Sequence, residues 1–227
     1  IKTDFVNNMT HEFKTPISTI ALSSDVLMRD DIIKNPERLK HYATIISEEN
    51  KRLKSQVESV LQVSQIDSHK IALNITSIDM HALIENISKN MEPRLEQQNG
   101  TIKLQLNAKK VFVAGDEVHL TNILYNLLDN AIKYCDKIPE IQITTQNKHK
   151  GIEISVKDNG KGIETSSQSM IFEKFFRVPS GNLHDVKGFG LGLFYVKNMI
   201  KLHKGKIALH SVPKVGTTFT IWFHTKD

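Results

Sequence analysis

The chain lacks several features that would place it in other classes of protein. Its 227 residues include one cysteine, Cys135, which excludes an intramolecular disulfide and suits a reducing compartment. It has no apolar run near the roughly 18 residues of a membrane span and no signal peptide, so we expect no membrane contact from this segment. Because it starts at Ile1 rather than Met, we expect it to be a fragment of a longer protein.

The charge of the chain says little about its partners. The formal charge is +5, but the lysines are scattered, and the sequence has no basic helix or aromatic-basic platform. We therefore expect a solvated basic surface and no nucleic-acid partner. The length allows one large domain or two modest ones.

The first 68 residues have the pattern of two helices joined by a turn, with Asn35 as the expected N-cap and Pro36 at the first helical position. In the second helix a seam recurs in steps of four and three: Leu39, Ala43, Ile46, Asn50, Leu53, Val57 and Val60. One hairpin cannot cover the apolar stripes of both helices. The pattern therefore predicts an antiparallel hairpin that dimerises into a four-helix bundle.

A candidate nucleophile lies on the first helix. His11 falls opposite the apolar stripe, and the adjacent Glu12 can accept the second ring proton of the imidazole, which makes a neutral histidine a competent nucleophile. Thr15, one turn later, shares the face of His11. The alternatives are an ordinary surface histidine and a threonine that helps the chain turn before Pro16.

From about residue 75 the pattern changes. Strand-like alternation covers residues 101–106, 140–144, 152–156 and 217–223, and helical patterns cover 79–98, 116–134 and 190–203. This mixture predicts an α+β sandwich with helices on one face of a mixed sheet. We place the domains at residues 1–68 and 75–227, with a linker at 69–74.

Four polar residues share a face of the helix expected at 116–134, namely Asn126, Asn130, Lys133 and Tyr134. Asparagine is a mediocre helix former, so two of them one turn apart suggest a function. Their amide oxygens suit Mg²⁺, a hard ion that also keeps waters and phosphates. Lys133 can reach a phosphate, and Tyr134 can lie against a base or ribose. A polar helix face without a ligand is the alternative.

Two glycine-containing segments complete the candidate site. Asp158 closes a strand before a turn with Gly160 and Gly162, where it could accept a hydrogen bond from an exocyclic amine, although such turns are common. Three alternating glycines then lead into the last helix and offer N–H groups to phosphate: Gly188, Gly190 and Gly192. The aperiodic residues 173–187 before them are expected to form a lid, with a disordered segment as the alternative. The spacing matches neither a dinucleotide fingerprint nor a Walker A motif.

Taken together and in this order, the motifs resemble those of the sensor histidine kinases of two-component systems, over essentially all 227 residues. Residues 5–16 look like the phosphoacceptor box with the His-Glu-x-x-Thr pattern, and residues 122–134 look like the asparagine box. The segments at 158–162 and 188–192 are similar to the two glycine boxes of the family. Residues 171–176 match its phenylalanine box, and 215–219 match its last glycine-containing motif.

The resemblance implies a dimerisation and phosphotransfer hairpin followed by a Bergerat-type ATP-binding domain, with ATP and Mg²⁺ as cofactors. By this match His11 receives the γ-phosphoryl group and Glu12 takes a proton from the imidazole, while Thr15 is tied to phosphatase action on the regulator. Asn130 would hold Mg²⁺ with support from Asn126. The remaining matched positions would contact or enclose the nucleotide: Lys133, Tyr134, Asp158, Gly160, Gly162, Phe172, Gly188, Gly190, Gly192 and Thr217.

The family also implies partners and a location. The phosphoryl group would pass to an aspartate on the receiver domain of a response regulator, in the cytoplasm, with the parent protein anchored in the bacterial inner membrane. Two other classes compete with this interpretation. Non-kinase ATPases of the same nucleotide fold carry a catalytic glutamate where Asn126 stands, and a non-enzymatic scaffold would have degenerate nucleotide motifs. Lys204 departs from the family pattern, which often has glycine there.

Overall fold

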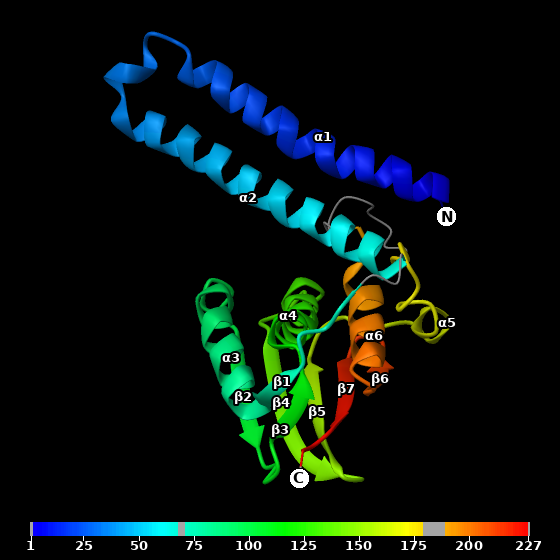
Figure 1. The fold of residues 1–227 in the computed structure, drawn as a ribbon. Coiled ribbons are helices and arrows are strands. Elements are labelled where there is room, and N and C mark those ends of the chain that lie inside the picture. The colour runs from blue at the N-terminus through cyan, green and yellow to red at the C-terminus, as the bar shows by residue number, and fades with distance from the viewer. Residues whose placement is uncertain (1, 68–70, 179–188, 227) are drawn as a thin grey trace. The chain divides into compact units, whose positions relative to one another are not determined.

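The computed structural model describes residues 2–67, 71–178 and 189–226. The chain divides into two compact units, one built on the N-terminal helices and the other containing nearly all of the remaining chain. In the first unit, α1 (Lys2–Leu27) and α2 (Pro36–Asp67) form an antiparallel hairpin around the short η1 (Ile32–Lys34) (Figure 1). The predicted cap is confirmed, because the N–H of Arg38 donates to Asn35 Oδ1 at 3.1 Å.

Pro16 lies inside α1, and the helix continues through it. Its ring is buried, and one turn further on the hydroxyl of Thr19 donates to the carbonyl of Thr15 at 3.0 Å. Proline removes one helical hydrogen bond, but the surrounding turns remain helical. The alternative reading of Thr15 as part of a turn before Pro16 is therefore wrong.

The hairpin leaves large apolar side chains exposed along both helices. They include Ile17, Leu22, Leu39, Val57 and Leu61, with exposed fractions between 41% and 67%. Two of them, Leu39 and Val57, belong to the predicted seam. Nearer the two ends, Ile32 and Val63 are buried. Two helices cannot enclose an apolar stripe on each, so the hairpin by itself leaves part of its seam uncovered.

The second unit is an α+β sandwich, as predicted. Its helices are α3 (Met80–Glu96), α4 (Glu117–Lys133), α5 (Thr165–Gln168) and α6 (Gly192–Leu202). Its strands are β1 (Thr76–Asp79), β2 (Thr101–Leu106), β3 (Phe112–Gly115), β4 (Glu140–Lys148), β5 (Gly151–Asp158), β6 (Lys206–Val212) and β7 (Gly216–His224). The main sheet has the order β2-β4-β5-β7-β6 and is mixed, since β2 and β4 pair in parallel and the other pairs are antiparallel. Strands β1 and β3 form a separate antiparallel pair (Figure 1).

The core lies between one face of the main sheet and the helices α3, α4 and α6. Alternate residues of the central strands are buried, as in the register pair Ile154 and Ile221 and the pair Val156 and Phe219. Seven residues of α4 face this core: Leu120, Ile123, Leu124, Leu127, Leu128, Ala131 and Ile132. Burying this stripe fixes the rotation of α4, and with it the direction of the polar face that carries the candidate site.

The three long helices expected here are confirmed, with small shifts at their ends. Asp79 and Asp116 are the N-caps of α3 and α4, and each side chain accepts two backbone N–H groups. The last helix begins at Gly192, because Gly190 has a left-handed φ of +69° that interrupts the helical path. The short elements β1, β3, β6 and α5 were not predicted. None of the described helices is long and apolar enough to cross a membrane.

Candidate functional site

Asn126, Asn130 and Lys133 lie on the half-exposed face of α4, as the helical spacing predicts. Tyr134 follows them as the C-cap residue rather than as part of the helix, and its ring is 41% exposed. The ammonium group of Lys133 lies 5.5 Å from the centre of that ring. This face therefore presents two amides, a cation and an aromatic ring within two turns.

The side chain of Asn126 is fixed between two helices. Its Nδ2 donates to the carbonyl of Asn122 at 2.7 Å, which turns Oδ1 toward the start of α6. A Cβ added to Gly192 would lie 2.6 Å from that oxygen, closer than two such atoms can approach. Glycine at 192 therefore lets α4 and α6 approach each other at the candidate site.

The chemistry near Asn130 fits a magnesium ion held mainly by oxygen atoms of a ligand. Among the described residues, no group of three or more His, Cys, Asp or Glu side chains could hold a metal. Asp129, the neighbouring carboxylate, forms an ion pair with Arg94. A hard ion that keeps waters and phosphates needs few protein ligands, so an amide oxygen from Asn130 suits it.

Asp158 ends β5 with its carboxylate half-buried. Its Oδ1 accepts the N–H of Gly160 at 2.9 Å and the N–H of Thr217 at 3.0 Å. Burial raises the pKa of the carboxyl, although these two N–H groups act to lower it. A buried carboxylate gains from a further donor, which is what an exocyclic amine supplies.

Backbone approaches around Asp158 require glycine at two positions. Gly162 has φ +66°, and a Cβ there would lie 2.1 Å from the carbonyl oxygen of Val212. Gly216 has φ +146°, and a Cβ there would lie 2.1 Å from the carbonyl oxygen of Asp158. The turn after β5 therefore lies directly against the end of β6, and the start of β7 lies directly against Asp158, which leaves the backbone around Asp158 little room to move.

Two other predicted residues have structural contacts of their own. Thr217 is buried, and its hydroxyl lies 2.9 Å from Ser211 Oγ. Phe172 packs edge-on against Phe219, with ring centres 6.3 Å apart, and Lys197 lies over its ring at 5.6 Å. Their contacts with a nucleotide stay predictions. Gly188 and residues 179–187 of the expected lid lie outside the described residues.

On the other unit, His11 lies in α1, and its side chain is outside what the structure describes. The carboxylate of Glu12 is held from α2, because its Oε2 lies 3.3 Å from both Arg52 Nη2 and Gln56 Nε2. Thr15 is exposed. Arg52 and Gln56 were not among the predicted residues, although their spacing of four places them on one face of α2.

A buried polar junction at the base of α4 was not predicted from the sequence either. Asp116 Oδ1 caps the helix, its Oδ2 accepts the N–H of Asn74 at 2.8 Å, and its own N–H donates to His203 Nε2 at 3.0 Å. His203 Nδ1 donates in turn to the carbonyl of Met199 at 2.7 Å, which fixes the neutral tautomer. Burial lowers the pKa of His203, although the bond to Met199 acts to raise it.

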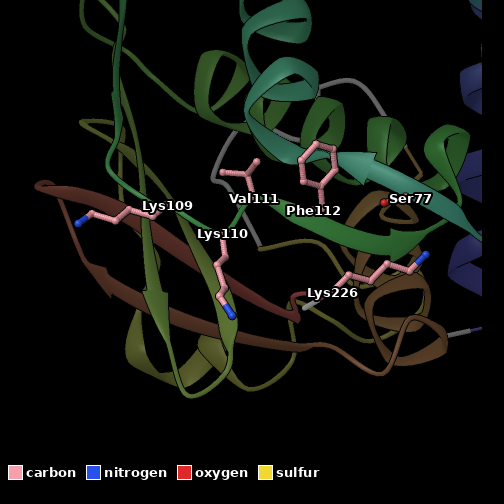
Figure 2. A pocket seen from close by; sticks show the side chains of 6 residues that line it. All are labelled: Ser77, Lys109, Lys110, Val111, Phe112 and Lys226. Atoms are coloured by element: carbon pink, nitrogen blue, oxygen red, sulfur yellow. The ribbon is translucent and has the colours of Figure 1, made fainter.

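A shallow groove of about 460 Å³ lies elsewhere on the second unit, lined by Ser77, Lys109, Lys110, Val111, Phe112 and Lys226. Figure 2 shows the ammonium groups of its three lysines pointing in different directions. Cations that diverge in this way do not enclose one phosphate. The groove is therefore a poor candidate for the nucleotide site.

Family comparisons agree with this geometry and define the class of the protein. Residues 1–69 match the His Kinase A (phospho-acceptor) domain family. Residues 115–227 match the family described as histidine kinase-, DNA gyrase B- and HSP90-like ATPases. A phosphoacceptor domain followed by this type of ATPase domain is the catalytic core of a protein-histidine kinase.

The chain belongs to the sensor histidine kinases of two-component systems. It is 45% identical over 225 residues to the sensor protein RprX of Bacteroides fragilis. The aligned region covers 97% of this chain and 43% of that protein. The chain spans about half the length of the curated relatives it matches.

Two solved structures share the fold of the whole chain. The histidine kinase ShkA, solved in complex with AMPPNP, superposes with a TM-score of 0.72 at 23% identity, over 99% of this chain and 46% of that one. The histidine kinase ThkA, solved with the response regulator TrrA, gives a TM-score of 0.69 at 23% identity, over 98% and 61%. The predicted fold and family are thus confirmed.

Proposed function

We propose that this chain transfers the γ-phosphoryl group of ATP to His11 and then to an aspartate of a response regulator. The observation that supports this proposal most is on the second unit, where α4 carries Asn126 and Asn130 on its half-exposed face and the carboxylate of Asp158 is held by two backbone N–H groups. The domain order supports it, since a phosphoacceptor domain precedes the ATPase domain. The two functional parts would be residues 1–68 and 75–227, joined by the linker at 69–74.

Each predicted residue has a role that follows from its chemistry. Asp158 would accept the adenine amine, Lys133 would contact a phosphate, and Tyr134 would lie against the base or ribose. Asn130, with support from Asn126, would hold Mg²⁺, which when bound neutralises charge on the phosphates. The side chains of Phe172 and Thr217 would supply further contacts. The remaining contacts would come from backbone at the glycines: Gly160, Gly162, Gly188, Gly190 and Gly192.

On the hairpin, one ring nitrogen of His11 would attack the γ-phosphorus while the bond to the ADP oxygen breaks and its electron pair leaves with ADP. Glu12 would take the proton from the other ring nitrogen. Thr15, exposed one turn away, would position water during dephosphorylation of the regulator.

Partners follow from the same surfaces. The exposed apolar side chains of α1 and α2 support a homodimer in which two hairpins complete a four-helix bundle. The complex of ThkA with TrrA supports a response regulator as the second partner. We place the reaction in the cytoplasm and propose an inner-membrane parent, which is supported by relatives that are named sensor proteins and are about twice as long.

A non-kinase ATPase is disfavoured by Asn126. An ATPase that hydrolyses its nucleotide needs a base to activate water, and an amide at that position has no such basicity. The locked geometry around Asp158 likewise argues against a scaffold with a degenerate site.

The experiment is incubation with γ-labelled ATP and Mg²⁺, followed by treatment of the labelled protein with acid and with alkali. A phosphohistidine is lost in acid and survives alkali, and His11→Gln should abolish the label while nucleotide binding stays nearly unchanged. Acid-labile label on the His11→Gln variant would refute the acceptor assignment. Rapid phosphate release without a labelled protein would favour the ATPase alternative.

A further inference from the structure

Phosphoryl transfer to a histidine leaves a proton on the second ring nitrogen, and the base that takes it must be held in position. Glu12 is the residue to which the proposed function gives this role, and the inference below rests on that function. Two side chains of α2 bind its carboxylate.

Arg52 and Gln56 reach across the hairpin to the same oxygen of Glu12. The distances are 3.3 Å from Arg52 Nη2 and 3.3 Å from Gln56 Nε2, both to Oε2. The positions are 40 and 44 residues away in sequence, so the contacts depend on how the hairpin folds. Two donors from successive turns of a neighbouring helix restrict a carboxylate more than one donor does.

The network is sheltered and supported from its own helix. The side chain of Glu12 is 16% exposed and that of Arg52 is 23% exposed, so solvent screens this pair less than a surface ion pair. Arg52 Nη1 also forms an ion pair with Glu49 Oε2 in the preceding turn, at 3.6 Å, which is too long for a hydrogen bond. Arg52 therefore lies between two carboxylates, and its hydrogen bond goes to Glu12.

The orientation of Gln56 is set by Glu12. Its Oε1 is buried and has no hydrogen-bond partner within the described part of the chain. Turning the amide over would place this oxygen against Oε2 of Glu12, and two acceptors would then face each other. In this orientation Gln56 Oε1 stays without a hydrogen-bond partner among the described residues, as does Glu49 Oε2 beside Arg52, while Nε2 of Gln56 keeps its hydrogen bond to Glu12.

We propose that Arg52 and Gln56 are positioning residues for the autokinase reaction, and that they act by orienting the carboxylate of Glu12 through Oε2. In the reaction the bond from the imidazole nitrogen to phosphorus forms, the bond from phosphorus to the ADP oxygen breaks, and the displaced imidazole proton moves to Glu12. Neither Arg52 nor Gln56 exchanges a proton or contacts the nucleotide. They contribute by orienting the carboxylate that accepts this proton.

The test is a double-mutant cycle on labelling by ATP, measured as a rate constant and a KM for ATP. Arg52→Met should slow labelling about tenfold or more at saturating ATP, with the KM for ATP changed less than about twofold. Arg52→Lys should recover part of the rate, because it restores the charge without the planar fork. Combining Arg52→Met with Glu12→Gln should give a rate no lower than Glu12→Gln alone, since Arg52 acts only through Glu12.

The matched control is Lys54→Met, which removes a cation from the same helix. Lys54 is 78% exposed and is paired with Glu58 of α2, so labelling should not change. If Arg52→Met destabilises the hairpin, as shown by helical melting, Gln56→Met takes its place in the same cycle. An unchanged rate, or additive losses with Glu12→Gln, would overturn the inference.

The outcomes also separate this inference from the proposed function. If the wild-type chain carries no acid-labile label, or Glu12→Gln labels at the wild-type rate, the assigned roles of His11 or Glu12 fail. If Glu12→Gln loses activity while Arg52→Met and Gln56→Met keep it, only the positioning role fails.

Discussion

The side-chain oxygen of Asn126 faces the Cα of Gly192 so closely that a methyl group on Gly192 would lie 2.6 Å from it. Asn126 cannot easily turn away, because its amide nitrogen is bonded to the carbonyl of Asn122. Helices α4 and α6 therefore meet through one amide and one missing side chain. The approach lies beside the residues assigned to the metal and the phosphates.

Gly192→Ala should destabilise the protein by about 1–3 kcal/mol, because the added methyl group pushes the two helices apart. Made in the Asn126→Ala background, the same change should lose most of this destabilisation, since the oxygen that the methyl group would meet is gone. Urea denaturation of the four proteins of this cycle measures both effects. Equal destabilisation by Gly192→Ala in both backgrounds would contradict the contact.

Lys204→Gly should stabilise the protein by about 1 kcal/mol. Lys204 has a left-handed φ of +56°, and α6 ends in a Schellman motif, with bonds from Gly205 N–H to Ile200 and from Lys204 N–H to Lys201. Glycine is the residue that this position prefers. The control is Lys201→Gly in the last turn of α6, which should cost about 1 kcal/mol. Thermal or urea unfolding that ranks the two variants in the reverse order would refute the argument.

His203 should give the protein an acid-sensitive component of stability. Burial lowers its pKa below the ordinary value of 6.5, so the unfolded chain takes up this proton before the folded chain does. The contribution is therefore complete above about pH 6.5 and is lost as the pH falls from there toward the folded pKa. His203→Gln should be less stable at neutral pH but should lose less stability as the pH falls below about 6.5. Parallel curves of unfolding free energy against pH would show that His203 is not the group responsible.

Asp158→Asn should weaken ATP binding by about 1.5–3 kcal/mol, because a charge-assisted hydrogen bond to the adenine amine becomes a neutral or mismatched one. Stability without nucleotide should change little, since an amide oxygen can still accept from Gly160 and Thr217. Asp136→Asn, at an exposed position, is the control. Calorimetry with ATP and ADP measures the affinity. An unchanged affinity in the Asp158→Asn variant would show that other residues recognise the adenine.

Thr15→Ala should separate two activities that depend on one helix face. A threonine hydroxyl has no accessible pKa for use as a base, so labelling of His11 should remain nearly normal while dephosphorylation of a regulator slows. Thr19→Ala is a matched control, because the Thr19 hydroxyl is bonded to the carbonyl of Thr15. Both rates should be measured on one preparation. Loss of labelling alone would contradict the assignment.

The long elements could be predicted from sequence because burial leaves a periodic trace. The apolar stripe of α4 is buried over several turns, and Asn35 followed by Pro36 marks a helix start by local chemistry. The seam of α2 is equally periodic, although the hairpin leaves Leu39 and Val57 exposed. Asp158 and the glycines near it could be chosen as candidates because a strand end followed by glycines can be recognised directly in the sequence.

Contacts between distant positions could not be predicted in this way. The four-residue strands β1 and β3 are too short to show a period, and their pairing is what brings Asn74 to Asp116. The bond from Arg52 to Glu12 depends on the register of two helices, which the spacing within either helix does not determine. The helix predicted over the first residues is confirmed through Pro16, and only the alternative of a turn before it was wrong.

The bond between Asn74 and Asp116 also bears on how kinases of this kind can be recombined. Asp116 holds the backbone of Asn74 with one oxygen and the start of α4 with the other, so the segment from Asn74 onward is an integral part of the nucleotide-binding unit. A chimaera that joins a foreign hairpin to this unit should therefore cross over before Asn74. A crossover between Asn74 and Asp79 would exchange β1 and remove a strand and a helix cap from the recipient.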